Sequence, residues 1–167
     1  MTSGLRVLVT SDTHIPDFAK RLPATLLAEA ARSDLVLHAG DVTSPAVLEE
    51  LAIHAPVHVA AGNNDGPEIS RWGARLEVRL ELEGVRIAML HDSGPAKARE
   101  GRMRRRFPDA DLVVFGHSHI PIDAEADGQR LFNPGSPTWK RRQPQPTYGV
   151  LELRAGQVRS RVLQLFN

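Results

Sequence analysis

Near its start the chain reads Leu5-Arg6-Val7-Leu8-Val9-Thr10-Ser11-Asp12-Thr13-His14. The segment from Leu5 to Thr10 is short, mostly aliphatic and rich in β-branched residues, which is typical of a buried strand. A carboxylate and an imidazole, those of Asp12 and His14, come directly after its expected end. The same order, a buried strand and then Asp, Asn or His, returns four more times along the chain.

The first sixty residues alternate between short apolar runs and helical patterns. Strands are expected at residues 5–10, 35–37 and 57–60, and helices at residues 23–31 and 45–53. Ser44 precedes the second helix and is expected to cap it. This alternation predicts parallel strands in an α/β layer.

From residue 76 onward the pattern indicates antiparallel hairpins. Residues 76–82 alternate apolar and charged side chains, and a Glu83-Gly84 turn joins them to residues 85–90. A basic helix at 96–106, a strand at 112–115 and a final hairpin of residues 148–153 and 158–165 are expected to follow. Two packed sheets with helices outside would cover all of these apolar faces.

Composition limits the class of protein. The 167 residues, 41% hydrophobic and 25% charged, fit one globular domain over residues 1–167. A net charge of +1 gives no clear nucleic-acid or membrane surface, and the absence of Cys excludes disulfides and thiolate chemistry. No apolar run approaches the roughly 20 residues of a membrane span. We therefore expect a cytoplasmic protein, and a homo-oligomer is compatible with the sequence.

Polar residues follow five predicted strands, in the loops 12–14, 38–41, 62–65, 91–92 and 116–119. Loops at the carboxyl ends of strands gather at one edge of an α/β sheet. Imidazole, carboxylate and amide donors without sulfur suit transition-metal ions, and seven donors suit two ions that share a carboxylate. The donors are Asp12, His14, Asp41, Asn63, His91, His117 and His119. Glycines 40, 62 and 116 are expected to let the backbone turn sharply beside them.

The charges of such a site favour a small phosphate ester as substrate. Two divalent ions would bring four positive charges, and Asp12 and Asp41 would return two negative ones. The remaining positive charge would attract an anionic ester and stabilise charge that develops on its oxygens. Hydrolysis of a phosphate ester is the reaction that this chemistry predicts.

In order along the chain, Asp12-Thr13-His14, Gly40-Asp41, Gly62-Asn63-Asn64-Asp65, His91 and Gly116-His117-Ser118-His119 resemble the motifs of the calcineurin-like metallophosphoesterases. The length resembles the small single-domain phosphodiesterases of bacteria and archaea, and the match extends to the loop at residues 133–136. The resemblance implies an α/β fold, a four-layer α/β/β/α sandwich of two mixed sheets flanked by helices.

The resemblance also implies a ligand set. Asp12, His14, Asp41 and His119 would hold one divalent ion, and Asp41, Asn63, His91 and His117 would hold the other, with Asp41 shared. Manganese is favoured, and iron, zinc, nickel or cobalt would also suit these donors. We expect a hydroxide that bridges the two ions to attack phosphorus in line.

Three further residues are catalytic candidates. Asn64 stands where many family members have a His that protonates the leaving group, and an amide cannot supply that proton. Asp65 would orient a ligand or close a turn. His38 would support a ligand or pack in the core.

Alternatives remain at this point. The chain could be a non-catalytic scaffold on the same fold, like the retromer subunit that resembles these enzymes, or a phosphomonoesterase such as a protein phosphatase. The arginines of residues 99–106 form either a solvated helix face or a surface that steers an anionic substrate. The run Lys140-Arg141-Arg142 beside Trp139 would hold a nucleotide or a protein, or would simply be solvated.

Overall fold

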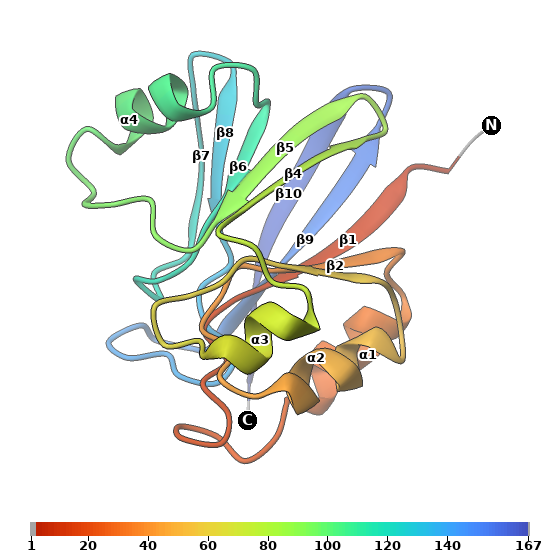
Figure 1. Ribbon diagram of the computed structural model, residues 1–167. Coiled ribbons are helices and arrows are strands. Elements are labelled where there is room, and N and C mark those ends of the chain that lie inside the picture. The colour runs from red at the N-terminus through yellow and green to blue at the C-terminus, as the bar shows by residue number, and fades with distance from the viewer. Residues whose placement is uncertain (1–2, 167) are drawn as a thin grey trace.

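The apolar run near the start of the chain is β1, the central strand of one of two five-stranded sheets (Figure 1). The computed structural model describes residues 3–166. In this range the elements are β1 (Leu5–Thr10), α1 (Ala24–Ala31), β2 (Leu35–His38), α2 (Pro45–Ala52), β3 (Val57–Val59), α3 (Pro67–Trp72), β4 (Glu77–Leu82), β5 (Val85–Leu90), α4 (Arg99–Arg106), β6 (Leu112–Val114), β7 (Ile122–Ala126), β8 (Gln129–Asn133), β9 (Thr147–Arg154) and β10 (Gln157–Gln164).

Both sheets contain parallel and antiparallel pairs. The first has the order β10-β9-β1-β2-β3, in which β1, β2 and β3 run parallel. The second has the order β4-β5-β6-β8-β7, in which β5, β6 and β8 run parallel. Antiparallel hairpin partners complete both sheets. The carboxyl ends of six parallel strands are therefore available to build a site.

Alternating side chains along β1 hold the layers together. Val7 and Val9 point into the core between the two sheets, whereas Leu8 points into the core under helices α1, α2 and α3. A third core packs α4, through Met103, against the outer face of the second sheet. The predicted four-layer α/β/β/α sandwich is confirmed, with three helices on one side and α4 on the other (Figure 1).

The strands and helices expected from the sequence are present, with shifted ends. The basic helix starts at Arg99 instead of residue 96, because Ala98 has a left-handed φ of 60° that interrupts the helical backbone. Ser44 is the N-cap residue of α2, as expected, with an extended backbone, but its side chain makes no capping hydrogen bond.

Three elements were not expected from the sequence, α3, β7 and β8. The six residues of α3 are too few to show a helical period. The strand β7 has no buried residue, and three of its five residues, Asp123, Ala124 and Glu125, are exposed, so it lacks the apolar pattern of a core strand. The Asp127-Gly128 dipeptide between β7 and β8 is the sequence signal that could have predicted this hairpin, because Asp-Gly favours two-residue hairpin turns. Both residues have positive φ in the structure, as do Glu83-Gly84 and Ala155-Gly156 in the other two hairpins.

Among residues 3–166, no helix combines the length and the apolar character that crossing a bilayer requires.

Phe132 gives a test of the core between the sheets. Its fully buried ring lies against Gly149 of the other sheet, where an added Cβ would come within 2.4 Å of the ring. We expect Phe132→Ala to lower the free energy of unfolding by about 3–5 kcal/mol, measured by urea denaturation. Phe166→Ala, at a side chain that is 74% exposed, should change it by less than about 0.5 kcal/mol. Equal losses in the two variants would contradict the assignment of Phe132 to this core.

Candidate metal centre

Backbone hydrogen bonds join the loops that follow the parallel strands. The Asp12 N–H donates to the carbonyl of Gly40 at 2.8 Å, which connects the loops after β1 and β2. The Gly116 N–H donates to the carbonyl of His91 at 2.9 Å, which connects the loops after β5 and β6. The His117 N–H donates to Asp12 Oδ2 at 3.0 Å and so connects the two sheets. The predicted meeting of these loops at one edge is what the fold produces.

A first group of ligand atoms is buried and lacks partners. Asp12 Oδ1 lies 3.4 Å from His119 Nε2 and 3.8 Å from His14 Nε2. None of these three buried atoms has a hydrogen-bond partner within the described residues. An unsatisfied buried polar group costs about 1–3 kcal/mol, so three that converge need a common partner. A divalent cation fits this set of imidazole and carboxylate donors.

A second group lies beside the first and is more open. It consists of Asp41, His91 and His117, whose candidate ligand atoms lie within 4.8 Å of one another. Asp41 Oδ2 lies 3.3 Å from His91 Nε2 and 3.4 Å from His14 Nε2, so one oxygen faces both groups. Asn63 Oδ1 lies 3.1 Å from His117 Nδ1. The amide oxygen expected to bind a metal ion therefore lies beside the second group. The His117 side chain is 45% exposed.

Backbone carbonyls orient two of the imidazoles. His119 Nδ1 is 2.7 Å from the carbonyl oxygen of Trp139, and His91 Nδ1 is 2.7 Å from that of Ala39. A carbonyl only accepts, so Nδ1 carries the hydrogen in each ring. When such a ring is neutral, its Nε2 lone pair points into the site. This support fixes the tautomer that a metal ligand needs.

The charges of the site shift three pKa values. Burial raises the pKa of Asp12, but the nearby imidazoles of His119 and His14 outweigh burial and hold it well below its usual range. Burial also raises the pKa of Asp41, yet its contacts with His91 and Asn64 bring it down to about 2. Burial lowers the pKa of His91, whereas its contact with Asp41 and the charge of Asp12 raise it to about 9. Both carboxylates are therefore ionised and attract cations.

The candidate ligands share an unusual backbone conformation. Five of them have a left-handed φ between 42° and 72°, which is uncommon for residues other than glycine. They are Asp12, His14, Asp41, His117 and His119. Such residues cost about 1–3 kcal/mol each and cluster at functional sites. Their grouping here indicates that side-chain placement outweighs backbone preference.

The three glycines beside the ligands have two different roles. Gly40 has a φ of +101°, as the sharp turn expected there requires. Tight turns also begin at Gly62 and Gly116, whose carbonyls accept hydrogen bonds from the N–H groups of Asp65 and Ser118. These two glycines lack the left-handed φ of Gly40, and the crowding around them leaves no room for a side chain. A Cβ on Gly62 would lie 2.2 Å from Asp41 Oδ1, and one on Gly116 would lie 2.0 Å from Ser11 Oγ.

The three residues named as catalytic candidates lie at different depths. Asn64 is exposed, and its N–H and Nδ2 both donate to the Asp41 carboxylate at 2.9 Å. Asp65 accepts hydrogen bonds from three backbone N–H groups, those of Asp41, Thr43 and Gly62, and so closes the loops. Its pKa is raised, chiefly by burial.

His38 is fully buried behind the ligands. Its Nδ1 accepts a hydrogen bond from the Gly40 N–H at 3.1 Å, and its Nε2 lies 3.1 Å from Thr13 Oγ1. Burial lowers the pKa of His38 to about 4, so the ring is neutral near pH 7. The contacts of His38 are those of a residue that positions the loops after β1 and β2.

The loop after β8 supports the site in a way that sequence reasoning missed. Ser136 Oγ donates to the Asp12 carbonyl at 2.8 Å, and Thr138 Oγ1 donates to the Thr13 carbonyl at 2.6 Å. The carbonyl of Trp139 then orients His119. The sequence carries no signal for these supporting hydrogen bonds, because they join residues that lie 124 and 125 positions apart in the chain.

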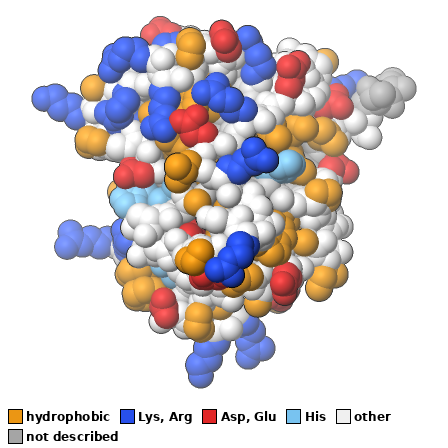
Figure 2. All heavy atoms as spheres, in the orientation of Figure 1, with side chains coloured by type: hydrophobic (Ala, Val, Ile, Leu, Met, Phe, Trp, Pro, Cys, Tyr) orange, Lys and Arg blue, Asp and Glu red, His pale blue; other side chains and the backbone are white. Residues whose placement is uncertain are grey.

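The basic cluster of α4 mostly holds neighbouring loops. Figure 2 shows Lys and Arg side chains gathered over the α4 end of the molecule. Arg102 donates to the carbonyls of Ser93 and Pro95, and Arg106 pairs with Glu77. These bonds give Arg102 and Arg106 a structural role that differs from both expectations, a solvated helix face and a surface that steers the substrate.

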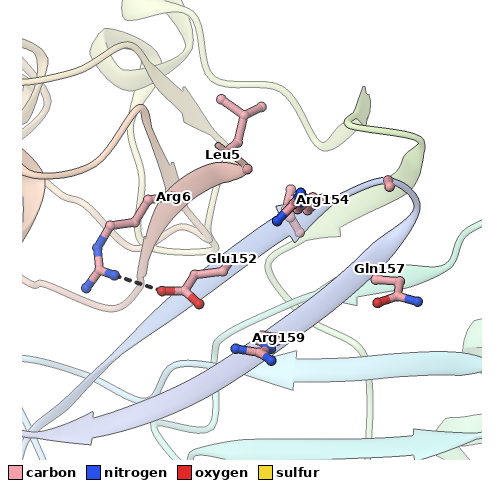
Figure 3. A pocket seen from close by; sticks show the side chains of 9 residues that line it. Leu5, Arg6, Glu152, Arg154, Gln157 and Arg159 are labelled. Atoms are coloured by element: carbon pink, nitrogen blue, oxygen red, sulfur yellow. Dashed lines mark hydrogen bonds and ion pairs between the residues drawn. The ribbon is translucent and has the colours of Figure 1, made fainter. Parts of the chain in front are cut away.

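A separate cavity of about 590 Å³ lies at the amino end of β1, opposite the candidate metal centre. Its walls come from β1 and the β9–β10 hairpin, and an ion pair of Arg6 and Glu152 lies along it (Figure 3). It contains none of the candidate ligands.

Comparison with known proteins agrees with this geometry. The family model of the calcineurin-like phosphoesterase superfamily domain matches residues 5–156. The chain belongs to this family. The family resemblance inferred from the motifs is thereby confirmed, and membership supports a metal-dependent phosphoesterase.

Three similar proteins illustrate the range of the family. A probable metallophosphoesterase of Methanothermobacter thermautotrophicus is 39% identical over 137 residues, which cover 78% of this chain and 76% of the relative. A phosphodiesterase of Methanocaldococcus jannaschii is 23% identical over 173 residues, covering 96% of this chain and 100% of the relative. Vacuolar Protein Sorting 29 of Cryptosporidium parvum has a TM-score of 0.85 and 25% identity, covering 99% of this chain and 94% of that one.

A substitution at Gly116 tests whether the position of Asp12 depends on the absence of a side chain at residue 116. We expect Gly116→Ala to push against Ser11 Oγ and Asp12 Oδ2, which would lie 2.0 and 2.7 Å from the new Cβ. Affinity for Mn²⁺, measured by calorimetry, should fall about 10–100-fold, as it does when a ligand's support is lost. Gly101→Ala in α4, whose Cβ meets only the end of Arg105, should leave affinity unchanged. Unchanged affinity in Gly116→Ala would refute this role.

Proposed function

We propose that this chain is a phosphodiesterase that uses two divalent metal ions. The observation that carries the proposal is the position of Asp41 Oδ2, which lies within 3.4 Å of an imidazole nitrogen from each ligand group. A carboxylate oxygen that faces both groups suits the shared ligand of a two-metal site. The unpartnered atoms of Asp12, His14 and His119 support the first half of that site.

The residues divide into two overlapping sets. Asp12, His14, Asp41 and His119 would hold one ion, and Asp41, Asn63, His91 and His117 would hold the other. When bound, such ions polarise phosphoryl oxygens and lower the pKa of water toward neutrality. Manganese is the proposed ion, and iron, zinc, nickel or cobalt would also suit the mixed nitrogen and oxygen donors.

The chain's own groups would place the ester. His117 and Asn63 are exposed, so the phosphate would approach from their side. The Asn64 amide is also exposed and can donate a hydrogen bond to a phosphoryl oxygen, but it has no acidic proton to give to the leaving group. Asp65 and His38 would act by holding the loops that carry Asp41 and Asp12.

A diester is favoured over a monoester as substrate. It lacks the second negative charge of a monoester, so an attacking hydroxide meets less repulsion. The relative from Methanocaldococcus jannaschii is named a phosphodiesterase, which supports the same choice.

A scaffold is the second candidate function, because the chain closely matches the fold of Vacuolar Protein Sorting 29. A scaffold would not need to turn over a substrate or to keep every ligand. All seven donors are present here, and six of them form the two candidate metal groups. We therefore place the enzyme first.

Metal dependence and substrate choice test the proposal together. We expect chelation to abolish hydrolysis of bis(p-nitrophenyl) phosphate, and Mn²⁺, Ni²⁺ or Co²⁺ to restore it better than Mg²⁺, which prefers all-oxygen sites. The diester should be cleaved faster than p-nitrophenyl phosphate in an assay of nitrophenolate release. Full activity in excess chelator would exclude the metal mechanism, and no cleavage with any metal would favour the scaffold.

Asp41→Asn is the matched variant for this experiment. Its turnover should fall by more than the roughly 10–100-fold that loss of a ligand's support costs. Asp34→Asn provides the control, because Asp34 is an exposed carboxylate at the amino end of β2. It should keep the activity of the unmodified protein.

Asn64 predicts how the rate depends on the leaving group. Without an acid to protonate the leaving oxygen, cleavage of substituted phenyl diesters should slow steeply as the leaving-group pKa rises. Asn64→His should flatten this dependence by raising the slow rates roughly 10-fold or more. Asn64→Gln keeps an amide and should keep the steep slope. A flat line for the unmodified protein would show that another group already supplies the proton.

A further inference from the structure

We infer that Phe18 and Trp139 form a stacking subsite for a planar aromatic ester group, as in a nucleoside phosphodiester. The inference rests on the proposed function and names the substrate class for the same site. It starts from two aromatic rings beside the candidate ligands whose arrangement neither the hydrophobic core nor the ligand set requires.

Trp139 is held directly against the candidate metal ligands. Its ring centre lies 5.1 Å from that of His14 and 5.0 Å from that of His119, and the planes are nearly perpendicular. Its carbonyl accepts the hydrogen bond that orients His119, and its N–H donates to Ser136 Oγ at 2.9 Å. The position of the indole relative to the candidate metal centre is therefore fixed.

Phe18 lies flat on Trp139. The ring centres are 3.4 Å apart and the planes differ by 8°. The Phe18 N–H donates to the His14 carbonyl at 2.9 Å, which ties this residue to a loop that also carries a ligand. Phe18 is nevertheless 51% exposed. One face of its ring rests on the indole, which leaves the other to solvent.

An exposed aromatic ring that is already supported from below is suited to stacking. Binding a planar group would bury apolar surface that is now wet, and little conformational freedom would be lost because the ring is already anchored. The centre of the Phe18 ring lies 5.8 Å from that of His14, a candidate metal ligand. A nucleotide separates its base from its phosphate by one sugar, so a base on Phe18 would leave the phosphate free to reach the candidate ligands.

Positive charge beside the stack favours a nucleotide. The Arg141 guanidinium lies 4.6 Å from the Trp139 ring centre, within a run of three basic residues, Lys140-Arg141-Arg142. Arg141 is exposed, whereas the α4 arginines Arg102 and Arg106 are already bonded to the protein. Proteins that bind single-stranded nucleic acid without sequence preference combine aromatic rings for the bases with basic groups for the phosphates.

Two esters with the same leaving group test the subsite by kinetics. Thymidine p-nitrophenyl phosphate and methyl p-nitrophenyl phosphate release the same nitrophenolate and differ only in the retained group. We expect Phe18→Ala to raise KM for the thymidine ester about 10-fold, since stacking on one ring contributes that much to binding. The methyl ester should change less than twofold. An equal effect on both esters would overturn the inference.

Two further variants separate stacking from structural damage. Phe18→Tyr keeps an aromatic face and should keep the low KM for the thymidine ester. Ile53→Ala removes an exposed apolar side chain at the far end of α2 and should affect neither ester. A high KM in Phe18→Tyr would contradict stacking as the mechanism.

Binding without turnover separates this inference from the proposed function. In a Trp72→Phe background, Trp139 is the remaining tryptophan and its fluorescence reports on the stack. Thymidine monophosphate should quench this fluorescence, and ribose phosphate, with the same charge but no base, should not. Selective quenching in a protein that cleaves no ester would support the subsite while excluding the phosphodiesterase. Equal responses to the two ligands, or quenching that survives Phe18→Ala, would overturn the subsite.

Discussion

The buried carboxylate of Asp12 connects the two sheets, and the site depends on its position. Its Oδ2 accepts hydrogen bonds from Ser11 Oγ and from the backbone N–H of His117, which follows a strand of the other sheet. Its own N–H donates to Gly40, and its carbonyl accepts from Ser136. Loops after β1, β2, β6 and β8 thus meet at one residue. Only Oδ1 remains without a partner, and it faces the imidazoles.

Holding these groups together costs stability. Five candidate ligands have left-handed backbones, and three buried ligand atoms lack partners, each at a cost of order 1–3 kcal/mol. The three hydrophobic cores and the loop hydrogen bonds to Asp65 offset this cost. A cation would satisfy the unpartnered atoms, so metal binding would stabilise the folded protein. The left-handed backbones and the unpartnered buried atoms are better explained by the need to place metal ligands than by folding alone.

The sequence predicted the parts of the molecule that have a local pattern. Alternation along residues 76–82 and aliphatic runs such as Leu5–Thr10 predicted strands, and polar residues after those strands predicted where they meet. It could not show that Gly116 is small because of Ser11, since that contact joins residues of different sheets. It likewise missed Phe18, an isolated aromatic in a loop, because only the fold brings it onto Trp139.

The two halves of the site differ, and the difference suggests how a diester would lie. Asp12, His14 and His119 are buried, and His119 is oriented by the loop that also carries Trp139. The other half opens to solvent at His117 and Asn64. A phosphate held between the halves would direct one ester group toward the aromatic stack and the other toward solvent beside Asn64. The group on the stack would be retained by its contacts, whereas the group beside Asn64 would leave with no acid to assist it.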